Sequence, residues 1–564
     1  MKNGYLYAGK ILWVDLTRRT VWTTPTAVYA ERFLGGRGIG TRIVWEKAGF
    51  PPVDPMGPDN VLSFDSGPLS GTMMPGSGRC HVTSKSPLTD LLGVASFGGS
   101  FAPELKYAGY DHLVITGQAA EPVYLAINNE EVTIRSAANL WGLDTHETPK
   151  ALRNDLNAEE IEWACIGPAG EKLIRFATII GNTRDSAGAT GLGAVMGSKK
   201  LKAIAVQGTG GLRIARPERF YEVCARTLDS LKVIDPDRTV SIQKLRRDKG
   251  PQMTVCFGCP SLCPRLFEEG NYVPGMLLSE ELALCSNKNG YDASSLGAMM
   301  SWVTELFEQG IINEKDVGFP LTRGNDEALL KLAEMIARRE GFGDVLAEGR
   351  IRAARAIGRG SERHVFRLDA GNSGAVSDEF VEFYGHFAEG VEGTRLPFPK
   401  EDVGKAETIV HAEDAIGRAE IVGGCKWHTE FNGLPITAEV HAEVLSTGLG
   451  KKITARELAI YQQRLHQIER TFNCQGGLRR EYDTLPDQYF AAPVPEGRFE
   501  DIAKDRSHME AMKDRYYKLR GWDPTTGVPA RATLESFDLK DVADILDKRK
   551  VNPVRKDGAS PRTQ

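Results

Sequence analysis

The sequence predicts an α+β protein in which an N-terminal antiparallel β-sandwich is followed by two mainly α-helical domains. At 564 residues the chain is too long for one compact core, so we expect several domains. Up to residue 208 it consists of short β-branched runs between tight turns, whereas apolar residues later recur at the i, i+3, i+4 spacing of helices. We place the domains at residues 1–208, 209–410 and 411–564.

The β-rich part is predicted from runs that alternate with turn-forming residues. The expected strands cover residues 10–17, 20–24, 112–116, 123–127, 132–135, 161–166 and 173–180. Arg18-Arg19 and Asn128-Asn129 occupy two of the connections, and a Gly-Pro-Ala-Gly turn follows the strand at 161–166. Short connections of this kind favour packed antiparallel sheets over βαβ units.

The helical part is predicted from amphipathic periodicity. The expected helices cover residues 216–232, 279–309, 325–340, 342–358, 454–472 and 501–519.

Composition excludes several classes of protein. Lys and Arg total 70 against 75 acidic residues, and the net charge of −5 comes without a basic stretch, so we expect no nucleic-acid partner. Nine cysteines are too few for a secreted disulfide scaffold. The N-terminus carries only a short apolar run, and no run of about 18 apolar residues occurs, so we expect neither a signal peptide nor a membrane span. A cytoplasmic location with reduced cysteines is therefore predicted.

The most informative motif is Cys256-Phe-Gly-Cys259-Pro-Ser-Leu-Cys263. Its C-x2-C-x3-C spacing places three thiolates within reach of three irons of a cubane cluster. Zinc sites usually combine two separated cysteine pairs, and no second pair follows here. The alternative is three buried thiols without a ligand. A cubane needs a fourth thiolate, and from spacing alone Cys425 and Cys474 are equal candidates.

A glycine-rich segment at residues 191–197 resembles a dinucleotide fingerprint. A true fingerprint opens a helix of about ten or more residues. The strand expected from Leu201 leaves no room for such a helix, so a phosphate-binding loop or a plain tight turn is the better interpretation.

These features occur within a set of motifs by which the chain resembles the tungsten-containing aldehyde:ferredoxin oxidoreductase family. Besides the cysteine run, the motifs are GGRGIG (35–40), SGPLSGTMMPGSGR (66–79), SKSPLT (84–89), FGGSFAPELKYAGYD (97–111), GLGAVMGSKKLKAI (191–204), GFGDVLAEG (341–349) and IERTFNCQGG (468–477). The resemblance covers almost the whole chain.

The resemblance implies three cofactors: a tungsten bis-pyranopterin (tungsten in preference to molybdenum), a [4Fe-4S] cluster, and a magnesium ion that bridges the pterin phosphates. The N-terminal β-sandwich would then be the base that carries the pterin. The resemblance assigns the cluster ligands to Cys256, Cys259, Cys263 and Cys425, and leaves Cys474 with a structural role.

The resemblance also implies pterin-binding residues. Two family motifs correspond to residues 287–292 and 420–425, although Asn287 and Glu420 stand where the family has aspartates. The implied cofactor-binding residues are Arg79, Ser96, Gly98, Ser186, Gly188, Gly191, Asn287, Tyr291, Asp292, Glu420 and Lys426. Ala189 replaces an arginine that is usual in the family. For Arg79, the alternative to a cofactor-binding role is an ordinary arginine on the surface.

The resemblance also implies candidate catalytic residues: Glu280 or Glu281 as general base and His386 as proton donor. Both glutamates also suit the solvated first turn of a helix capped by Ser279. The chain has no histidine pair at metal-ligand spacing, so no metal ion held by histidines is expected, and packing is the alternative role of His386.

The implied function is the interconversion of aldehydes and carboxylic acids under anaerobic conditions. Electrons would pass to ferredoxin or to a separate iron–sulfur or flavin subunit, in an oligomer or a heteromeric complex. Residues 391–400 and the loop around Ser186 also resemble the tungsten subunit of class II benzoyl-coenzyme A reductases. These enzymes reduce the aromatic ring of an acyl-CoA at low potential, which is the second possible function. That branch has a tungsten-ligating cysteine near the position of Glu280, and here the nearest cysteine is Cys285. A non-catalytic iron–sulfur relay subunit is the third alternative.

Overall fold

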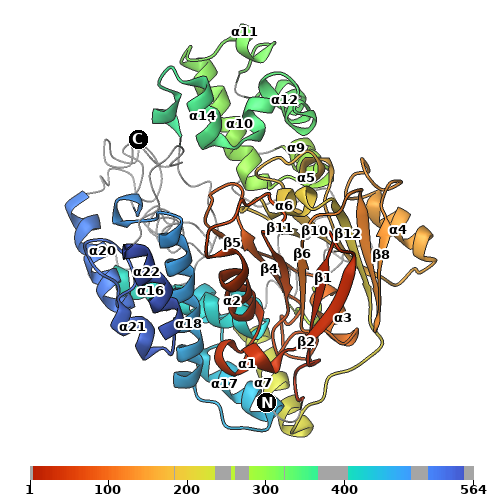
Figure 1. The fold of residues 1–564 in the computed structure, drawn as a ribbon, viewed down its shortest axis with the longest axis vertical. Helices are drawn as coiled ribbons and strands as arrows, with labels where there is room; N and C mark the ends of the chain where they lie inside the picture. The colour runs from red at the N-terminus through yellow and green to blue at the C-terminus, as the bar shows by residue number, and fades with distance from the viewer. Residues whose placement is uncertain are drawn as a thin grey trace.

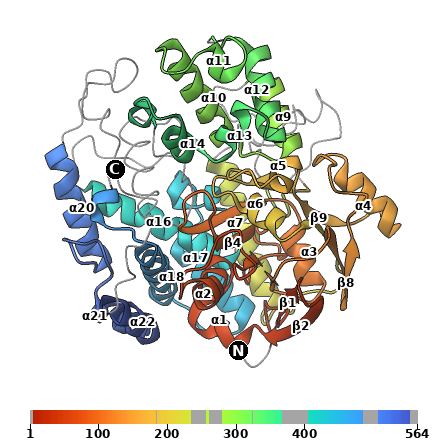
Figure 2. The same ribbon diagram turned by 45° about the horizontal axis from the view of Figure 1, so that its top comes forward.

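A computed structural model describes residues 4–182, 185–234, 256–260, 279–322, 324–365, 404–483 and 506–551. The two sheets of the N-terminal domain lie together (Figures 1 and 2). A second group of elements, helices α9 to α14 within residues 280–357, covers one end of the sheets, and a third group, α16 to α22 within residues 405–551, lies along their side.

The N-terminal domain consists of two six-stranded sheets. The first has the order β2 (Thr20–Pro25), β1 (Lys10–Asp15), β6 (His112–Thr116), β3 (Leu62–Asp65), β4 (Cys80–Lys85), β5 (Leu92–Phe97). The second has the order β11 (Ser186–Ala187), β10 (Ile179–Gly181), β9 (Glu162–Cys165), β12 (Leu201–Gln207), β7 (Val123–Asn128), β8 (Glu131–Ser136).

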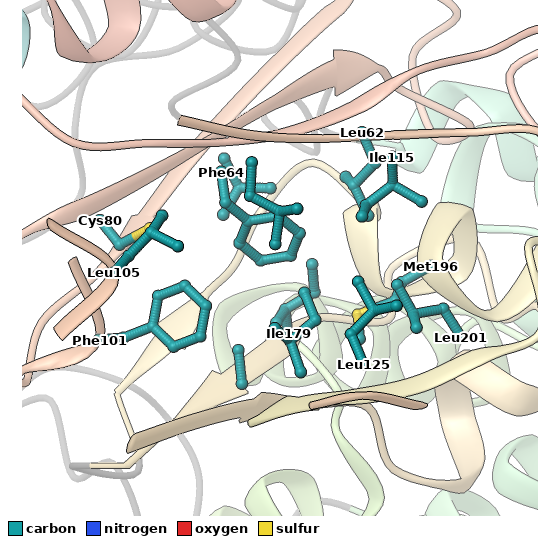
Figure 3. Packing of buried hydrophobic residues seen from close by; sticks show 14 of the residues in the cluster. Leu62, Phe64, Cys80, Phe101, Leu105, Ile115, Leu125, Ile179, Met196 and Leu201 are labelled. Atoms are coloured by element: carbon teal, nitrogen blue, oxygen red, sulfur yellow. The ribbon is translucent and has the colours of Figure 1, made fainter. Parts of the chain in front are cut away.

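The core of this domain lies between the two sheets. Phe64 and Ile115 from the first sheet face Leu125 and Ile179 from the second, and Phe101 of helix α3 (Phe101–Tyr107) lies beside them (Figure 3). All of these side chains are fully buried. Burial of each large apolar side chain contributes roughly 1.5–3 kcal/mol, so this layer holds the sheets together.

The predicted α+β class is confirmed, with one addition to the sheet topology. Most neighbouring strands are antiparallel, but β1 pairs with β6 and β7 pairs with β12 in parallel. The predicted hairpins β1–β2 and β7–β8 form. The strands β9 and β10 also pair, but β10 is only Ile179–Gly181 and not the strand expected over 173–180, and a short helix, α5 (Pro168–Glu171), lies between them. The parallel pairs join strands far apart in the sequence, which local turn patterns do not reveal.

Helices α1 (Ala27–Phe33), α2 (Gly36–Ala48), α4 (Thr148–Leu156) and α6 (Leu192–Ser198) complete this domain. Helix α6 has seven residues, so the segment after Gly191 is shorter than the helix of a dinucleotide fingerprint.

The second group of helices has its own core, which includes Leu296, Trp302 and Leu332. The helices are α9 (Glu280–Asn289), α10 (Ala293–Glu308), α11 (Glu314–Val317), α12 (Asp326–Arg338), α13 (Phe342–Ala347) and α14 (Arg350–Ile357). The single helix expected at 279–309 is two helices, because Gly290 ends α9 in the left-handed region and Asp292 caps α10 by accepting from the Ser295 amide. Gly349 divides the helix expected at 342–358 in the same way.

The third group lies against the N-terminal domain. Its main helices are α16 (Lys405–Val422), α17 (Ala438–Leu449), α18 (Ala455–Gln475), α20 (Arg506–Arg520), α21 (Arg531–Ser536) and α22 (Lys540–Val551). Both α16 and α18 pack on α2. Helix α7 (Pro217–Ile234) packs on α17, where Phe220 and Val223 share a core with Val444 and Leu445.

The expected domain boundaries correspond only partly to this packing. The boundary at residue 410 falls inside α16, and α7 lies with the third group rather than the second. Apolar faces pair according to the tertiary arrangement, which the order of elements along the chain does not reveal. Among the described helices, none is long and apolar enough to cross a membrane.

The N-terminal domain touches the end of α16 backbone to backbone at Gly67. The Leu69 amide donates to the Val422 carbonyl at 2.9 Å, and a Cβ on Gly67 would overlap the backbone of Val422 and Gly423. Only glycine permits this approach.

We therefore expect Gly67→Ala to lower the stability by roughly 1–3 kcal/mol, the usual cost of overpacking. The measurement is thermal unfolding of the purified variant. Gly211→Ala is the matched control, because a Cβ there meets nothing within 4 Å. Equal melting temperatures for the two variants would contradict the prediction.

Candidate functional site

The described part of the cysteine loop, residues 256–260, lies on two glycine-containing loops of the N-terminal domain. The Phe257 amide donates to the Gly99 carbonyl at 3.1 Å, and the Gly76 amide donates to the Gly258 carbonyl at 3.1 Å. The rings of Phe257 and Tyr107 meet edge to face, with centroids 6.4 Å apart. The loop is thus held against the N-terminal domain by its backbone and by the ring of Phe257.

Glycines make room for the sulfur atoms. A Cβ on Gly98 would overlap the Sγ of Cys256, and a Cβ on Gly76 would lie 3.2 Å from the Cβ of Cys425. The pKa of the Cys256 thiol is raised to about 12, chiefly by burial and then by Asp185 and Cys425, while Arg79 opposes them. The structure therefore brings Cys425 near Cys256, although the two are far apart in the sequence.

Cys474 lies elsewhere, in helix α18. It is buried, and its Sγ is 3.9 Å from the Gly527 carbonyl. The other described cysteines belong to cores: Cys80 between the sheets, Cys165 under the second sheet, and Cys224 on α7. Cys285 is half-buried and receives a contact from the Asn289 amide at 3.4 Å.

The donor set fits part of an iron–sulfur site. Cys256, Cys259 and Cys425 supply the thiol donors that such clusters use, and Gly98 leaves the space that the sulfur of Cys256 fills. Cys263 lies outside the described residues. Within the described ranges, no three His, Cys, Asp or Glu side chains form a metal-holding group by themselves.

Arg79 is a buried cation beside the cysteine loop. It is 7% exposed, which excludes the surface interpretation. Its guanidinium donates to Asp185 Oδ2 at 2.5 Å and to the Ser96 hydroxyl at 3.2 Å. The Gly98 amide donates to the same Asp185 oxygen at 2.8 Å. Asp185 carries no local signal in the sequence, because its partners Arg79 and Gly98 lie about a hundred residues away.

The first motif, residues 287–292, lies at the junction of α9 and α10. His146 Nε2 is 2.9 Å from Asn287 Oδ1, which orients the amide. A Cβ on Gly188 would overlap Asp292 Oδ1, so the loop at residues 186–188 lies directly on the motif. The structure thus brings together Ser186, Gly188, Asn287 and Asp292 from two domains.

Tyr291, by contrast, packs inside the protein. Its hydroxyl donates to the Ala333 carbonyl at 3.0 Å, and its ring stacks on Phe176 with centroids 5.5 Å apart. Gly191 also has a packing role: it has a φ of +74°, and a Cβ there would overlap the Arg175 carbonyl.

The second motif contains a buried ion pair. Arg37 Nη1 lies 2.6 Å from Glu420 Oε2, and Arg37 Nε lies 2.7 Å from Glu469 Oε1. Burial raises the pKa of Glu420, but the charges of Arg37, His81 and Lys426 outweigh it and lower the pKa to about 2. Glu420 is therefore ionised, with its oxygens held in place at neutral pH.

The candidate catalytic residues are only partly described. Helix α9 begins with Ser279 as its cap, which accepts from the Leu282 amide at 3.4 Å, and Glu281 in its first turn is exposed. The side chain of Glu280 and all of His386 lie outside the described residues.

Two buried histidines were not identified from the sequence. Burial lowers the pKa of His81 to about 4, beside Glu420 and Arg79. His428 is 3% exposed, and its Nε2 lies 3.8 Å from Cys259 Sγ. The only local signal for His428 is its spacing of three residues from Cys425.

Fold and site together define a class of protein: an oxidoreductase in which glycine-rich loops of a double-sheet domain meet a cysteine loop and buried arginine–carboxylate pairs. Residues 11–208 match the family model described as "Aldehyde ferredoxin oxidoreductase, N-terminal domain". Residues 207–539 match the family model described as "Aldehyde ferredoxin oxidoreductase, domains 2 & 3". The chain belongs to the aldehyde ferredoxin oxidoreductase family.

Relatives support this assignment over the full length of the chain. The tungsten-containing aldehyde ferredoxin oxidoreductase of Pyrococcus abyssi is 32% identical over 93% of this chain and 97% of its own. The aliphatic sulfonate oxidoreductase, WOR-like subunit, of Pyrococcus furiosus is 27% identical over 98% and 99%. Among solved structures, the active-site complex BamBC of benzoyl-coenzyme A reductase with 1,5-dienoyl-CoA matches with a TM-score of 0.80 and 26% identity, over 98% of this chain and 100% of that chain. The predicted resemblance is confirmed, and the protein is an oxidoreductase of a tungsten-containing family.

The Arg37–Glu420 pair predicts a pH-dependent contribution to stability. Because the pKa of Glu420 is depressed in the folded state, its contribution is complete above the ordinary value of 4.5 and is lost as the pH falls towards about 2. We expect Glu420→Gln to cost roughly 1.5–3 kcal/mol at pH 7, the value of a hydrogen bond to a charged group. The difference in the free energy of unfolding between Glu420→Gln and the parent protein should shrink below about pH 4.5.

The measurement is urea unfolding at a series of pH values. Glu130→Gln is the control, because Glu130 is 82% exposed in its pair with Lys10 and should contribute little. A Glu420→Gln deficit that is independent of pH would contradict the assigned ion pair.

Proposed function

We propose that this protein is a tungsten bis-pyranopterin and [4Fe-4S] oxidoreductase that interconverts aldehydes and carboxylic acids. The observation that carries the proposal is the convergence of Cys256, Cys425, Arg79 and the Gly98 loop, with Asp185 bonded to both Arg79 and the Gly98 amide. When bound, the tungsten centre would supply two-electron chemistry on an aldehyde and water, and the cluster would carry the electrons away singly.

Two pairs of segments from different domains would hold the pterins. Asn287, oriented by His146, and Glu420, oriented by Arg37, present oxygens that can accept from pterin N–H groups. The loop at residues 186–188 lies against Asp292, which is consistent with a magnesium and phosphate site there. Arg79 is a fixed cation between this region and Cys256.

Proton transfer is assigned to Glu280 or Glu281 and to His386, as the resemblance implies. A carboxylate at the first turn of α9 could accept a proton from the attacking water. Substrate is expected to be a small aldehyde or acid.

A separate electron carrier completes the proposal. Relatives of this chain are named as parts of larger assemblies, the WOR-like subunit and the BamBC complex. We therefore propose that electrons pass to ferredoxin or to a separate iron–sulfur or flavin subunit.

Low-potential reduction of an aromatic acyl-CoA is a second candidate. It is favoured by the TM-score of 0.80 to the benzoyl-coenzyme A reductase complex. Against it, Cys285 packs at the edge of the core of α9 to α14, where it contacts Asn289.

The decisive experiment combines anaerobic metal analysis with a viologen-coupled assay of aldehyde oxidation on the same sample. We expect tungsten, about four irons per chain and aldehyde-dependent reduction of the viologen. Iron without tungsten or molybdenum would overturn the enzyme proposal in favour of an electron relay. Tungsten without aldehyde activity, together with oxidation of a dienoyl-CoA, would favour the second candidate.

The fourth cluster ligand can be tested with a matched pair of cysteine variants. We expect Cys425→Ser to abolish the cluster's electron paramagnetic resonance (EPR) signal and to reduce the iron content, since Cys425 lies near Cys256. Cys474→Ser, which alters a buried thiol on α18, should keep both. The opposite outcome would transfer the ligand assignment to Cys474.

A further inference from the structure

His428 stands directly beside the cysteines of the proposed cluster. The 3₁₀ turn η3 (Lys426–His428) follows Cys425, and the His428 amide donates to the Cys425 carbonyl at 3.1 Å. Both side chains approach the same glycine: a Cβ on Gly76 would overlap His428 Nδ1 and would lie 3.2 Å from the Cβ of Cys425.

The imidazole is confined between the turn and the cysteine loop. Its Nε2 lies 3.8 Å from Cys259 Sγ. On its other side, Gly76 has a φ of +76°, and a Cβ there would overlap His428 Nδ1. Because the Gly76 amide also holds the Gly258 carbonyl, the same glycine positions both the ring and the loop that carries Cys259.

We propose that His428 donates an Nε2–H hydrogen bond to the sulfur of Cys259 and thereby raises the reduction potential of the cluster. The inference rests on the proposed function, because it requires the cluster. A ligating cysteine is a thiolate, which has no proton to donate, so the imidazole must be the donor. Hydrogen bonds to cluster sulfurs stabilise the reduced, more negative state and are a principal determinant of cluster potential.

His428 is a positioning residue and not a ligand, because it acts on the cluster through its hydrogen bond to Cys259. It couples the turn after Cys425 to a loop 169 residues earlier in the chain. The potential of the cluster then depends on the alignment of the two segments that supply its cysteines.

The test compares three variants of the full-length protein prepared anaerobically. His428→Phe removes the donor and keeps a ring, whereas His428→Gln keeps an N–H at similar reach. Trp427→Phe is the control on the same turn, because Trp427 packs towards Phe431 with ring centroids 5.7 Å apart. Each sample is analysed for iron and titrated potentiometrically, with the cluster's EPR signal as readout.

We expect His428→Phe to retain its iron and to show a more negative midpoint potential. A tenfold less favourable one-electron reduction corresponds to a shift of about 59 mV. His428→Gln and Trp427→Phe should show the same midpoint potential as the parent protein.

An unchanged potential in His428→Phe would overturn the inference. Loss of iron from His428→Phe would also overturn it, because the residue would then be a ligand or a requirement for loop folding. A parent protein without a cluster signal would overturn the proposed function itself, and is thus a distinguishable result.

Discussion

The arrangement of the site depends on Arg37, a buried cation that joins three helices. Arg37 is 2% exposed on α2 and bonds Glu420 of α16 and Glu469 of α18. Ions are costly to remove from water unless each is paired, so neither carboxylate can move from the guanidinium without a large penalty. The end of α16 is thereby held against the N-terminal domain, and Cys425 follows five residues after Glu420.

A second set of arginines joins the helical group that carries the other motif to the N-terminal domain. Arg175 pairs with Glu348 at 2.6 Å, and Arg352 pairs with Asp90 at 2.7 Å while it donates to the Leu88 carbonyl. Arg339 donates to the Leu173 carbonyl at 2.8 Å. These contacts join α12 to α14 with the N-terminal domain. The motif itself is held there by backbone hydrogen bonds, from the Thr178 amide to the Gly290 carbonyl at 2.8 Å and from the Asp292 amide to the Phe176 carbonyl at 3.0 Å.

Much of the fold followed from local patterns, because hairpins and amphipathic helices are encoded by neighbouring residues. The strand at His112–Thr116 and the Lys10–Pro25 hairpin formed as expected. A single helix is expected at 279–309 because the apolar spacing continues through Gly290. The helix is interrupted there because the backbone of Gly290 is left-handed. The parallel pairs β1–β6 and β7–β12 depend on contacts of long sequence separation, which no local pattern contains.

The sequence by itself determined the family, because its motifs are runs of neighbouring residues distributed over the whole chain. It left Cys425 and Cys474 equal by spacing. Only the tertiary structure placed Cys425 beside Gly76, which holds the cysteine loop, and Cys474 on α18 beside Gly527. The tertiary structure alone revealed Asp185 and His428, because their partners lie 106 and 169 residues away and meet them only when the domains pack.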